Sequence, residues 1–223
     1  GRKPMAPACI IIHGGYWRSS DKRNVVFAAE TFVEAGAAVF VINYDLCPAV
    51  SLDTIVAEIC EAVAWVSANA ATYGANSDRI HLVGHSAGAH LCAMMLCSYV
   101  DAVKGFDPDV IAGALMVSGL YETRSLISLS VNAELRLTAD MAVRNCPLVQ
   151  PFIRVVPLFV AVAAGETNEF IEQSRDLASV AVASGVPCEF FLVEVVGHFT
   201  ILQRLADPSE PMTAAFIDHV KNA

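Results

Sequence analysis

The sequence predicts an α/β fold, in which a mostly parallel sheet carries helices on both faces. Short apolar runs alternate along the chain with longer segments of helix length, as in proteins built from strand–helix–strand units. The apolar runs are almost continuous in Val, Ile, Leu, Ala and Phe, which is typical of strands that are buried on both faces. Together these two patterns predict a parallel sheet between two layers of helices.

Six apolar runs have the length of strands, and four longer segments between them have the length of helices. We expect strands over Ala8–His13, Ala37–Asn43, Arg79–Gly84, Ile111–Ser118, Val156–Ala163 and Cys188–Val195. We expect helices over Arg23–Ala35, Leu52–Tyr73, Ala87–Val100 and Glu169–Ser184. The second helix has clear ends, because Ser51 can cap its first turn and Gly74 follows its last residue.

Residues 119–152 interrupt this alternation. Polar and apolar residues are mixed over Leu126–Arg144, and Pro147 and Pro151 follow. We interpret the segment as a small cap over the C-terminal edge of the sheet. The length of 223 residues fits one domain over residues 1–223, with room for a sizeable core.

The composition excludes several classes of protein. Disorder needs low hydrophobicity and high charge, whereas 55% of these residues are hydrophobic and 17% are charged. The net charge of −9 argues against a nucleic-acid partner, which selects for basic surfaces. No apolar run reaches the about 18 residues of a membrane span, so we expect no membrane partner.

Seven cysteines are scattered along the chain without a CxxC pair. Several lie in apolar stretches, where cysteine behaves as a small hydrophobic side chain. This pattern argues against a disulfide framework and against a zinc site. We therefore expect a cytoplasmic protein. The sequence offers no site for a metal or an organic cofactor, and we expect none.

The run Gly84-His85-Ser86-Ala87-Gly88 lies between a predicted strand and a stretch rich in Ala, Leu and Met. A serine flanked by glycines two residues away on both sides is typical of a sharp strand-to-helix turn that exposes the hydroxyl above the sheet. The five-residue pattern occurs by chance in many chains, but here the strand and the helix stand where the turn requires them. The sequence therefore predicts that Ser86 is the nucleophile of a serine hydrolase.

A serine hydroxyl needs a base to take its proton, and the base needs an acid to orient it. In a parallel sheet both partners are expected in loops after later strands. His198 follows Gly197 at the end of the last predicted strand and is the predicted base. Glu166, after the preceding strand, is the favoured acid, with Glu169 and then Glu122 as alternatives.

The first predicted strand runs directly into His13-Gly14-Gly15. The backbone N–H groups of Gly14 and Gly15 can turn toward a developing oxyanion, and the Ala87 amide beside the nucleophile supplies another donor. We expect His13 to anchor this loop rather than to titrate during catalysis. The run Asn43-Tyr44-Asp45, after the second strand, should support the loop from below.

The substrate pocket is expected next to this loop. Aromatic residues usually fill cores, but the position of Tyr16 and Trp17 beside the loop favours a role for one of them in shaping the pocket. His85, inside the serine motif, is a further candidate for substrate binding. The remaining residues that select the substrate are expected within residues 119–152.

With these motifs in hand, the chain resembles the α/β-hydrolase superfamily and, within it, the kynurenine formamidase (arylformamidase)-like esterases. The resemblance spans residues 13–199 and rests on the HGGYW run from His13, the GHSAGAHL run from Gly84, Ser118-Gly119-Leu120-Tyr121, Glu166-Thr167-Asn168-Glu169-Phe170 with Gln173-Ser174, and His198-Phe199. It implies an α/β-hydrolase fold, with Ser86, Glu166 and His198 as the triad. Many members carry Asp where this chain has Glu166. Members usually carry further strands before the HGG strand, so we expect those strands to be missing from this chain.

The resemblance implies acyl transfer to water. Ser86 is expected to attack a formyl or short acyl carbonyl, and His198 to protonate the departing arylamine or alkoxide. We therefore predict an N-formyl-L-kynurenine formamidase of tryptophan catabolism, whose partner is a small-molecule acyl substrate. Two alternatives remain: a short-acyl carboxylesterase of the same fold, and a non-catalytic binding module of that fold. We expect that the protein can form a homodimer.

Overall fold

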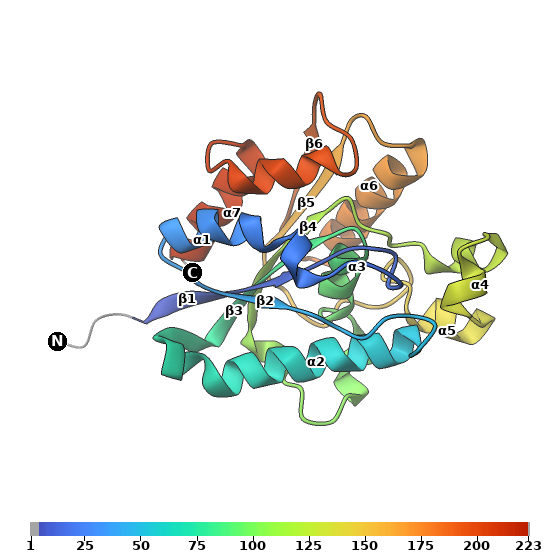
Figure 1. The fold of residues 1–223 in the computed structure, drawn as a ribbon, viewed down its shortest axis with the longest axis horizontal. Helices are drawn as coiled ribbons and strands as arrows, with labels where there is room; N and C mark the ends of the chain where they lie inside the picture. The colour runs from blue at the N-terminus through green and yellow to red at the C-terminus, as the bar shows by residue number, and fades with distance from the viewer. Residues whose placement is uncertain (1–4, 223) are drawn as a thin grey trace.

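A computed structural model describes residues 5–222, so the two ends of the predicted 1–223 domain lie outside the described residues (Figure 1). One sheet holds six strands in the order β2-β1-β3-β4-β5-β6, and all neighbouring pairs among them are parallel. The strands are β1 (Ala6–Ile12), β2 (Ala38–Ile42), β3 (Ala75–His85), β4 (Ile111–Val117), β5 (Leu158–Ala163) and β6 (Cys188–Val193). All six predicted strands are confirmed, with ends that differ by a few residues.

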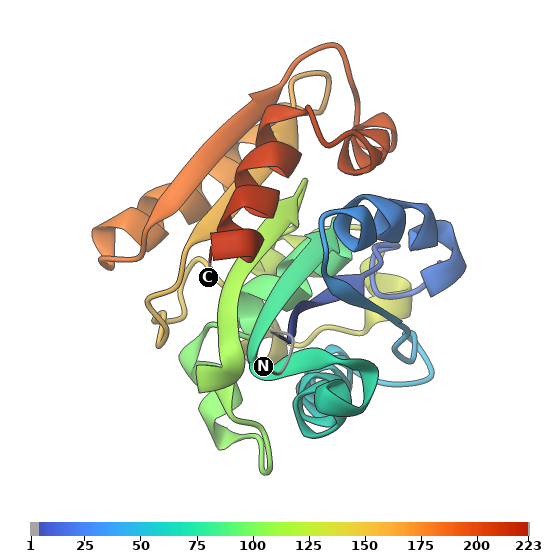
Figure 2. The same ribbon diagram turned by 90° about the vertical axis from the view of Figure 1, so that its left-hand side faces the viewer.

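Helices cover both faces of this sheet, as Figures 1 and 2 show. One face carries α2 (Leu52–Asn69), α3 (Ala87–Met94) and α6 (Asn168–Ala183), and the other carries α1 (Ala29–Glu34) and α7 (Pro211–Asn222). Strand side chains alternate between the two apolar cores, because Ile10 and Ile12 join the first and Cys9 and Ile11 join the second. Both faces are buried, which explains the continuous apolar runs in the sequence.

The helix predicted over Leu52–Tyr73 has the predicted ends. Ser51 Oγ accepts a hydrogen bond from Thr54 N at 3.2 Å, and Gly74 closes a 3-10 turn over Ala70–Tyr73 with a φ of +77°. Within residues 5–222 it is the one helix long and apolar enough to cross a membrane. Seven residues of α2 (Leu52–Asn69) are buried in the apolar core, so it is a core helix of this domain.

Two predicted helices are shorter in the structure. The segment Arg23–Ala35 forms two 3-10 turns before α1, because the β-branched pair Val25-Val26 disfavours a continuous helix. The helix predicted over Ala87–Val100 ends at Met94, since the chain then turns to pair with residues 151–153. Ser98 N donates to Pro151 O at 2.9 Å, and Ile153 N donates to Leu96 O at 2.9 Å.

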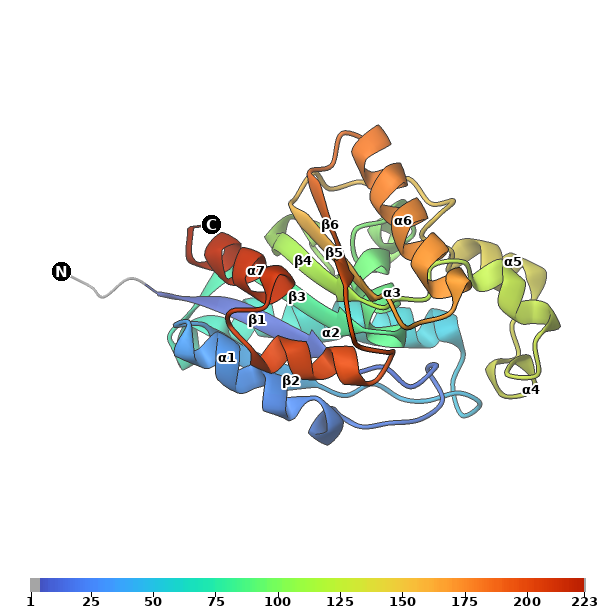
Figure 3. The same cartoon turned by 90° about the horizontal axis from the view of Figure 1, so that it is seen from above.

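Residues 119–152 interrupt the strand–helix alternation, as predicted, and the structure shows that they form a small helical excursion. It contains a 3-10 turn over Thr123–Ser128, α4 (Asn132–Leu135) and α5 (Ala139–Arg144). Figures 1 and 3 show α4 and α5 at the far end of the molecule, on the side of the carboxyl ends of the strands. An ion pair from Arg144 ties α5 to Asp53 of α2 at 2.7 Å.

Candidate active site

Ser86 lies in the sharp turn between β3 and α3. Its backbone has φ 55° and ψ −119°, a conformation that few residues adopt and that lifts the side chain out of the strand. The turn fits only because Gly88 has no side chain, since a Cβ there would lie 2.1 Å from Ile12 O. The predicted strand–serine–helix turn is therefore present, with Ser86 at its apex.

The structure brings Ser86, His198 and Glu166 together, although 112 residues separate the first two. Ser86 Oγ lies 3.1 Å from His198 Nε2, and His198 Nδ1 lies 3.0 Å from Glu166 Oε2. The loop after β5 supplies Glu166, and the loop after β6 supplies His198. With the Nδ1–H donating to the carboxylate, Nε2 is left as the acceptor for the serine hydroxyl, which is the arrangement that activates a serine.

Glu166 is held in place by two further donors. The Ser118 hydroxyl donates to Glu166 Oε1, and the Ala163 N–H donates to the same oxygen at 3.2 Å. The Glu166 side chain is almost fully buried, with 1% of its surface exposed. This burial opposes the negative charge, but the hydrogen bonds from His198, Ser118 and Ala163 outweigh it, so the pKa of Glu166 is lowered. The carboxylate is therefore charged at neutral pH.

The two alternative acids lie elsewhere. Glu169 is exposed in the first turn of α6, the position expected of an acid that interacts with a helix N-terminus. Glu122 pairs with Arg124 in the excursion 119–152. Glu166 is thus the carboxylate that the structure places against His198.

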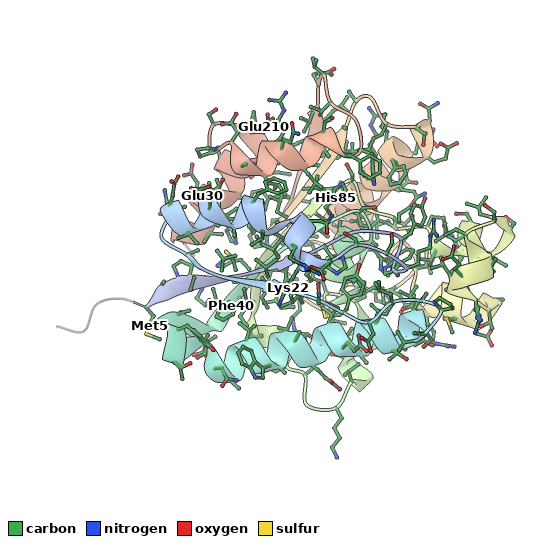
Figure 4. All side chains as sticks on the ribbon, viewed as in Figure 1. Met5, Lys22, Glu30, Phe40, His85 and Glu210 are labelled. Atoms are coloured by element: carbon green, nitrogen blue, oxygen red, sulfur yellow. The ribbon has the colours of Figure 1, made fainter. Side chains whose placement is uncertain are left out.

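Aromatic rings surround the His198 imidazole. The rings of His85, Phe170 and Phe199 lie 4.8, 4.7 and 5.2 Å from it. His85 also faces the His198 backbone, with its Nε2 at 2.8 Å from His198 O. Burial and the neighbouring His198 lower the pKa of His85 to about 4, so its ring is neutral and donates the Nε2–H to that carbonyl. His85 lies inside the molecule near the carboxyl ends of the strands (Figure 4).

The loop after β1 passes directly beside Ser86. A Cβ on Gly14 would lie 3.0 Å from Ser86 Cβ, and Gly15 has a φ of +106° that an L side chain rarely adopts. Ala87 is the first residue of α3, and the first N–H groups of a helix have no partner within it. All three residues predicted to bind the oxyanion therefore have their backbone near Ser86. Gly14 and Gly15 lie in the loop after β1, and Ala87 lies at the start of α3.

His13 and Tyr44 support this loop, as the sequence predicted. The Tyr44 hydroxyl lies 3.0 Å from His13 O and 3.2 Å from Gly14 O, and the two rings stack with centroids 4.3 Å apart. Burial lowers the pKa of His13, so its imidazole is neutral and anchors the loop without a charge. The loop is therefore held from below by a buried aromatic pair.

Ser86 and His198 open onto a cavity of about 480 Å³. Its walls come from the loop after β1, the serine turn, the start of α6 and the loop after β6, and include Tyr16, Arg18, Phe170, Phe199 and Leu202. The expectation that residues 119–152 supply the pocket is wrong for the described structure. None of its described residues lines the cavity. The segment is tied to α2 through Arg144 and to α6 through Gln173, and its Glu134 forms an ion pair with Arg18 of the cavity wall.

Trp17 is a second correction. Its side chain is fully buried in the core and packs edge-on against His90, with ring centroids 4.8 Å apart. Tyr16 and Trp17 both have positive φ, and this tight turn sends the Tyr16 side chain to the cavity and the Trp17 side chain into the core. Of the two aromatic candidates, Tyr16 alone lines the cavity.

The comparisons with known proteins agree with this geometry. A family model described as BD-FAE matches residues 1–116. The kynurenine formamidase of Danio rerio is 32% identical over 215 residues, which cover 94% of this chain and 71% of that protein. The chain belongs to the kynurenine formamidase-like α/β-hydrolases. The Salmo salar kynurenine formamidase is also 32% identical, over 93% of this chain and 70% of that protein.

A solved arylesterase structure shows how general the fold of this α/β-hydrolase is. It superposes with a TM-score of 0.78 over 98% of this chain and 76% of that chain, at 19% sequence identity. At that identity the likeness concerns the fold alone. The formamidase relatives carry the finer similarity, and they identify the chain as an arylformamidase-like hydrolase.

Sequence reasoning about this arylformamidase-like hydrolase missed roles for Ser118, Arg18 and Phe170. Ser118 immediately follows β4 at the same sheet edge as Ser86, Glu166 and His198, so its position after a strand was an available signal. Arg18 and Phe170 lie in a loop and at the start of a helix, where local patterns do not indicate which way a side chain faces.

Proposed function

We propose that the protein is a serine-dependent formamidase that hydrolyses N-formyl-L-kynurenine to kynurenine and formate. The observation that carries the proposal is the chain of hydrogen bonds from Ser86 through His198 to Glu166 at the wall of the cavity. The similarity to kynurenine formamidases over almost the whole chain supports this choice of substrate.

The first half of the reaction transfers the formyl group to the enzyme. Ser86 Oγ attacks the formyl carbon while His198 Nε2 takes the hydroxyl proton, and Glu166 stabilises the imidazolium that forms. The carbonyl oxygen becomes an oxyanion beside the N–H groups of Gly14, Gly15 and Ala87. His198 then gives its proton to the arylamine nitrogen, the C–N bond breaks, and kynurenine leaves.

The second half regenerates the serine. His198 takes a proton from water, and the resulting hydroxide attacks the formyl ester on Ser86. The same N–H groups bind the second oxyanion, and His198 returns the proton to Ser86 Oγ as formate leaves. Each proton moves through one imidazole, and the mechanism uses no metal or organic cofactor.

The cavity suits an aryl group next to a small acyl group. Its apolar wall contains Tyr16, Phe170 and Phe199, which can pack against a flat ring. Its volume of about 480 Å³ lies within the range of small-molecule sites.

The compartment and the assembly are expectations that accompany this proposal. All seven cysteines are free thiols and six are buried, which suits a reducing compartment such as the cytoplasm. The expected partner is the small-molecule acyl substrate, and neither a nucleic acid nor a membrane is expected to bind. The homodimer stays a prediction.

The test compares kcat/KM for N-formyl-L-kynurenine and for p-nitrophenyl acetate in the same preparation. We expect the formamide to be the better substrate, although the nitrophenyl ester has the more reactive carbonyl. A preference for the ester would favour the carboxylesterase alternative. Hydrolysis of neither compound, in a folded protein, would favour the non-catalytic binding module.

A further inference from the structure

We propose that Arg18 binds a carboxylate of the substrate, so that the preferred substrates are aryl formamides that carry a negative charge remote from the scissile bond. The inference rests on the proposed function and names a residue that selects among its substrates. It follows from the charge of the cavity wall, from the way in which Arg18 is held there, and from its present partner.

Arg18 is the one Lys or Arg among the described residues that line the cavity, and no Asp or Glu stands among them. The remainder of the wall consists of glycine, serine, asparagine, histidine, tyrosine and apolar side chains. The whole chain carries a net charge of −9, and this overall negative charge repels an anion. An anionic substrate therefore has one local cation to approach, and it is Arg18.

The backbone of Arg18 is fixed relative to the reacting atoms. Arg18 N donates to Gly15 O at 3.1 Å, and Ser19 N donates to the same oxygen at 3.0 Å, which closes the turn that follows Gly14. The positive charge also acts on the wall itself. Burial raises the pKa of Tyr16, and the Arg18 charge opposes that rise, so the guanidinium influences the neighbouring phenol.

The guanidinium already holds a carboxylate. Arg18 Nη1 donates to Glu134 Oε1 of α4 at 2.6 Å. The side chains are 39% and 48% exposed, and ion pairs that are exposed to this degree are weak. A guanidinium has five N–H donors arranged as a fork that matches a carboxylate, so a substrate carboxylate can replace Glu134 or share the cation with it.

This arrangement makes Glu134 a competitor of the substrate. Removal of the Glu134 charge leaves Arg18 free and takes a repelling anion away from the cavity mouth. Removal of the Arg18 charge takes away the attraction. The two variants should therefore change the selectivity for anionic substrates in opposite directions, which a merely structural role of the ion pair does not predict.

The experiment uses N-formyl-L-kynurenine and its primary carboxamide, which replaces the carboxylate by a neutral group of the same shape. We expect the native enzyme to have the higher kcat/KM for the carboxylate. In Arg18→Gln the ratio of the two kcat/KM values should fall about 10-fold or more, mainly through a higher KM for the carboxylate. In Glu134→Gln the ratio should rise by a few fold.

Arg124→Gln is the matched control. Arg124 is also a half-exposed arginine paired with a glutamate, Glu122, in the excursion 119–152, but it does not line the cavity. The control changes the net charge as Arg18→Gln does, and its ratio of kcat/KM values should stay at the native value. Added salt should reduce the native ratio, because it screens an exposed guanidinium.

The outcomes separate this inference from the proposed function. Equal ratios in the native enzyme and in Arg18→Gln, with both formamides hydrolysed, would overturn the role of Arg18 and leave the formamidase standing. A fall in Glu134→Gln, parallel to that in Arg18→Gln, would also overturn it, because it would indicate a structural ion pair. Hydrolysis of p-nitrophenyl acetate without hydrolysis of either formamide would refute the formamidase, and this inference with it.

Discussion

Strand β3 places one imidazole pair at the candidate site and another further back along the same face of the sheet. His85, at the end of the strand, lies 4.8 Å from His198, and His81, four residues earlier, lies 5.2 Å from His219 of α7, both measured between ring centroids. Both strand histidines are buried, and a cavity of several hundred Å³ opens near each pair. By burial and ring contacts alone the two regions look alike.

Their hydrogen-bond partners differ. His198 lies between a hydroxyl and a carboxylate, whereas His219 Nε2–H donates to the carbonyl of Ala112 at 3.0 Å. The described residues that line the cavity beside His219 include no serine, threonine or cysteine. In a parallel sheet the loops that follow the strands bring side chains together at the carboxyl edge, and Ser86, Glu166 and His198 meet there. Partners, and not burial, therefore distinguish a catalytic imidazole from a structural one.

The strongest test of this difference between the two imidazole pairs removes the Ser86 hydroxyl. Ser86→Ala should reduce kcat by about 10⁴-fold or more, because the triad acts as a unit and only the acceleration from the oxyanion donors and substrate binding, about 10³- to 10⁴-fold over water, is left. Circular dichroism and the melting temperature should stay close to native values. Incubation with a serine-directed phosphonate, followed by intact-mass measurement, should show one adduct on the native protein and none on the variant. An adduct on Ser86→Ala would place the nucleophile elsewhere.

The carboxylate is the next partner to remove. Glu166→Gln should lower kcat by about 10²- to 10⁴-fold, because an amide neither orients the imidazole correctly nor stabilises its positive charge. Glu169→Gln, three residues on, is the matched control and should leave kcat within about two-fold. Steady-state kinetics on both variants decide the matter. If the two variants exchanged these effects, Glu169 would be the acid in solution.

The sequence supplied those parts of the site that follow strands. Ser86, Glu166 and His198 lie within a few residues of the ends of β3, β5 and β6, and a parallel sheet brings such positions to one edge whatever separates them in the chain. The sheet, the ends of α2 and the support from Tyr44 could be predicted for similar local reasons. Each of these features depends on a local signal in the sequence, namely hydrophobic periodicity, a capping residue or a pair of glycines, that spans only a few residues.

The walls of the cavity could not be predicted in this way. Tyr16 and Trp17 are adjacent and aromatic, and only the turn geometry decides that one faces the cavity and the other the core. The excursion 119–152 was expected to cover the site, but its contacts with α2 and Arg18 depend on long-range packing. Irregular segments have no repeating hydrophobic pattern, so the sequence does not indicate which way their side chains face.

A smaller effect should separate the two imidazole pairs directly. His85→Leu leaves the His198 carbonyl without its buried donor and should lower kcat about 10-fold, since His198 then shifts against Ser86. His219→Leu removes the equivalent bond to Ala112 and should lower the melting temperature while kcat is retained. His85→Gln, whose amide N–H can reach the same carbonyl, should restore most of the rate. A loss of kcat in His219→Leu, or no loss in His85→Leu, would contradict the positioning role of His85.

The last prediction concerns the pH dependence of stability and the structural histidine His81. Burial lowers the pKa of His81 to about 3, with smaller contributions from His219 and Arg79, whereas an unfolded chain has a histidine pKa of about 6.5. The unfolded state therefore binds the proton first, so this share of the stability is present above pH 6.5 and is lost as the pH falls toward 3. One such group contributes a slope of at most about 1.4 kcal/mol per pH unit. In His81→Phe the free energy of unfolding should depend less steeply on pH between pH 6 and pH 4, by up to this slope. Denaturant titrations at pH 7.5 measure separately how the substitution changes the packing. Parallel curves for the native protein and the variant would show that His81 does not titrate with unfolding, and the acid sensitivity would then be assigned to the other buried histidines, since burial also lowers the pKa of His13, His85 and His90.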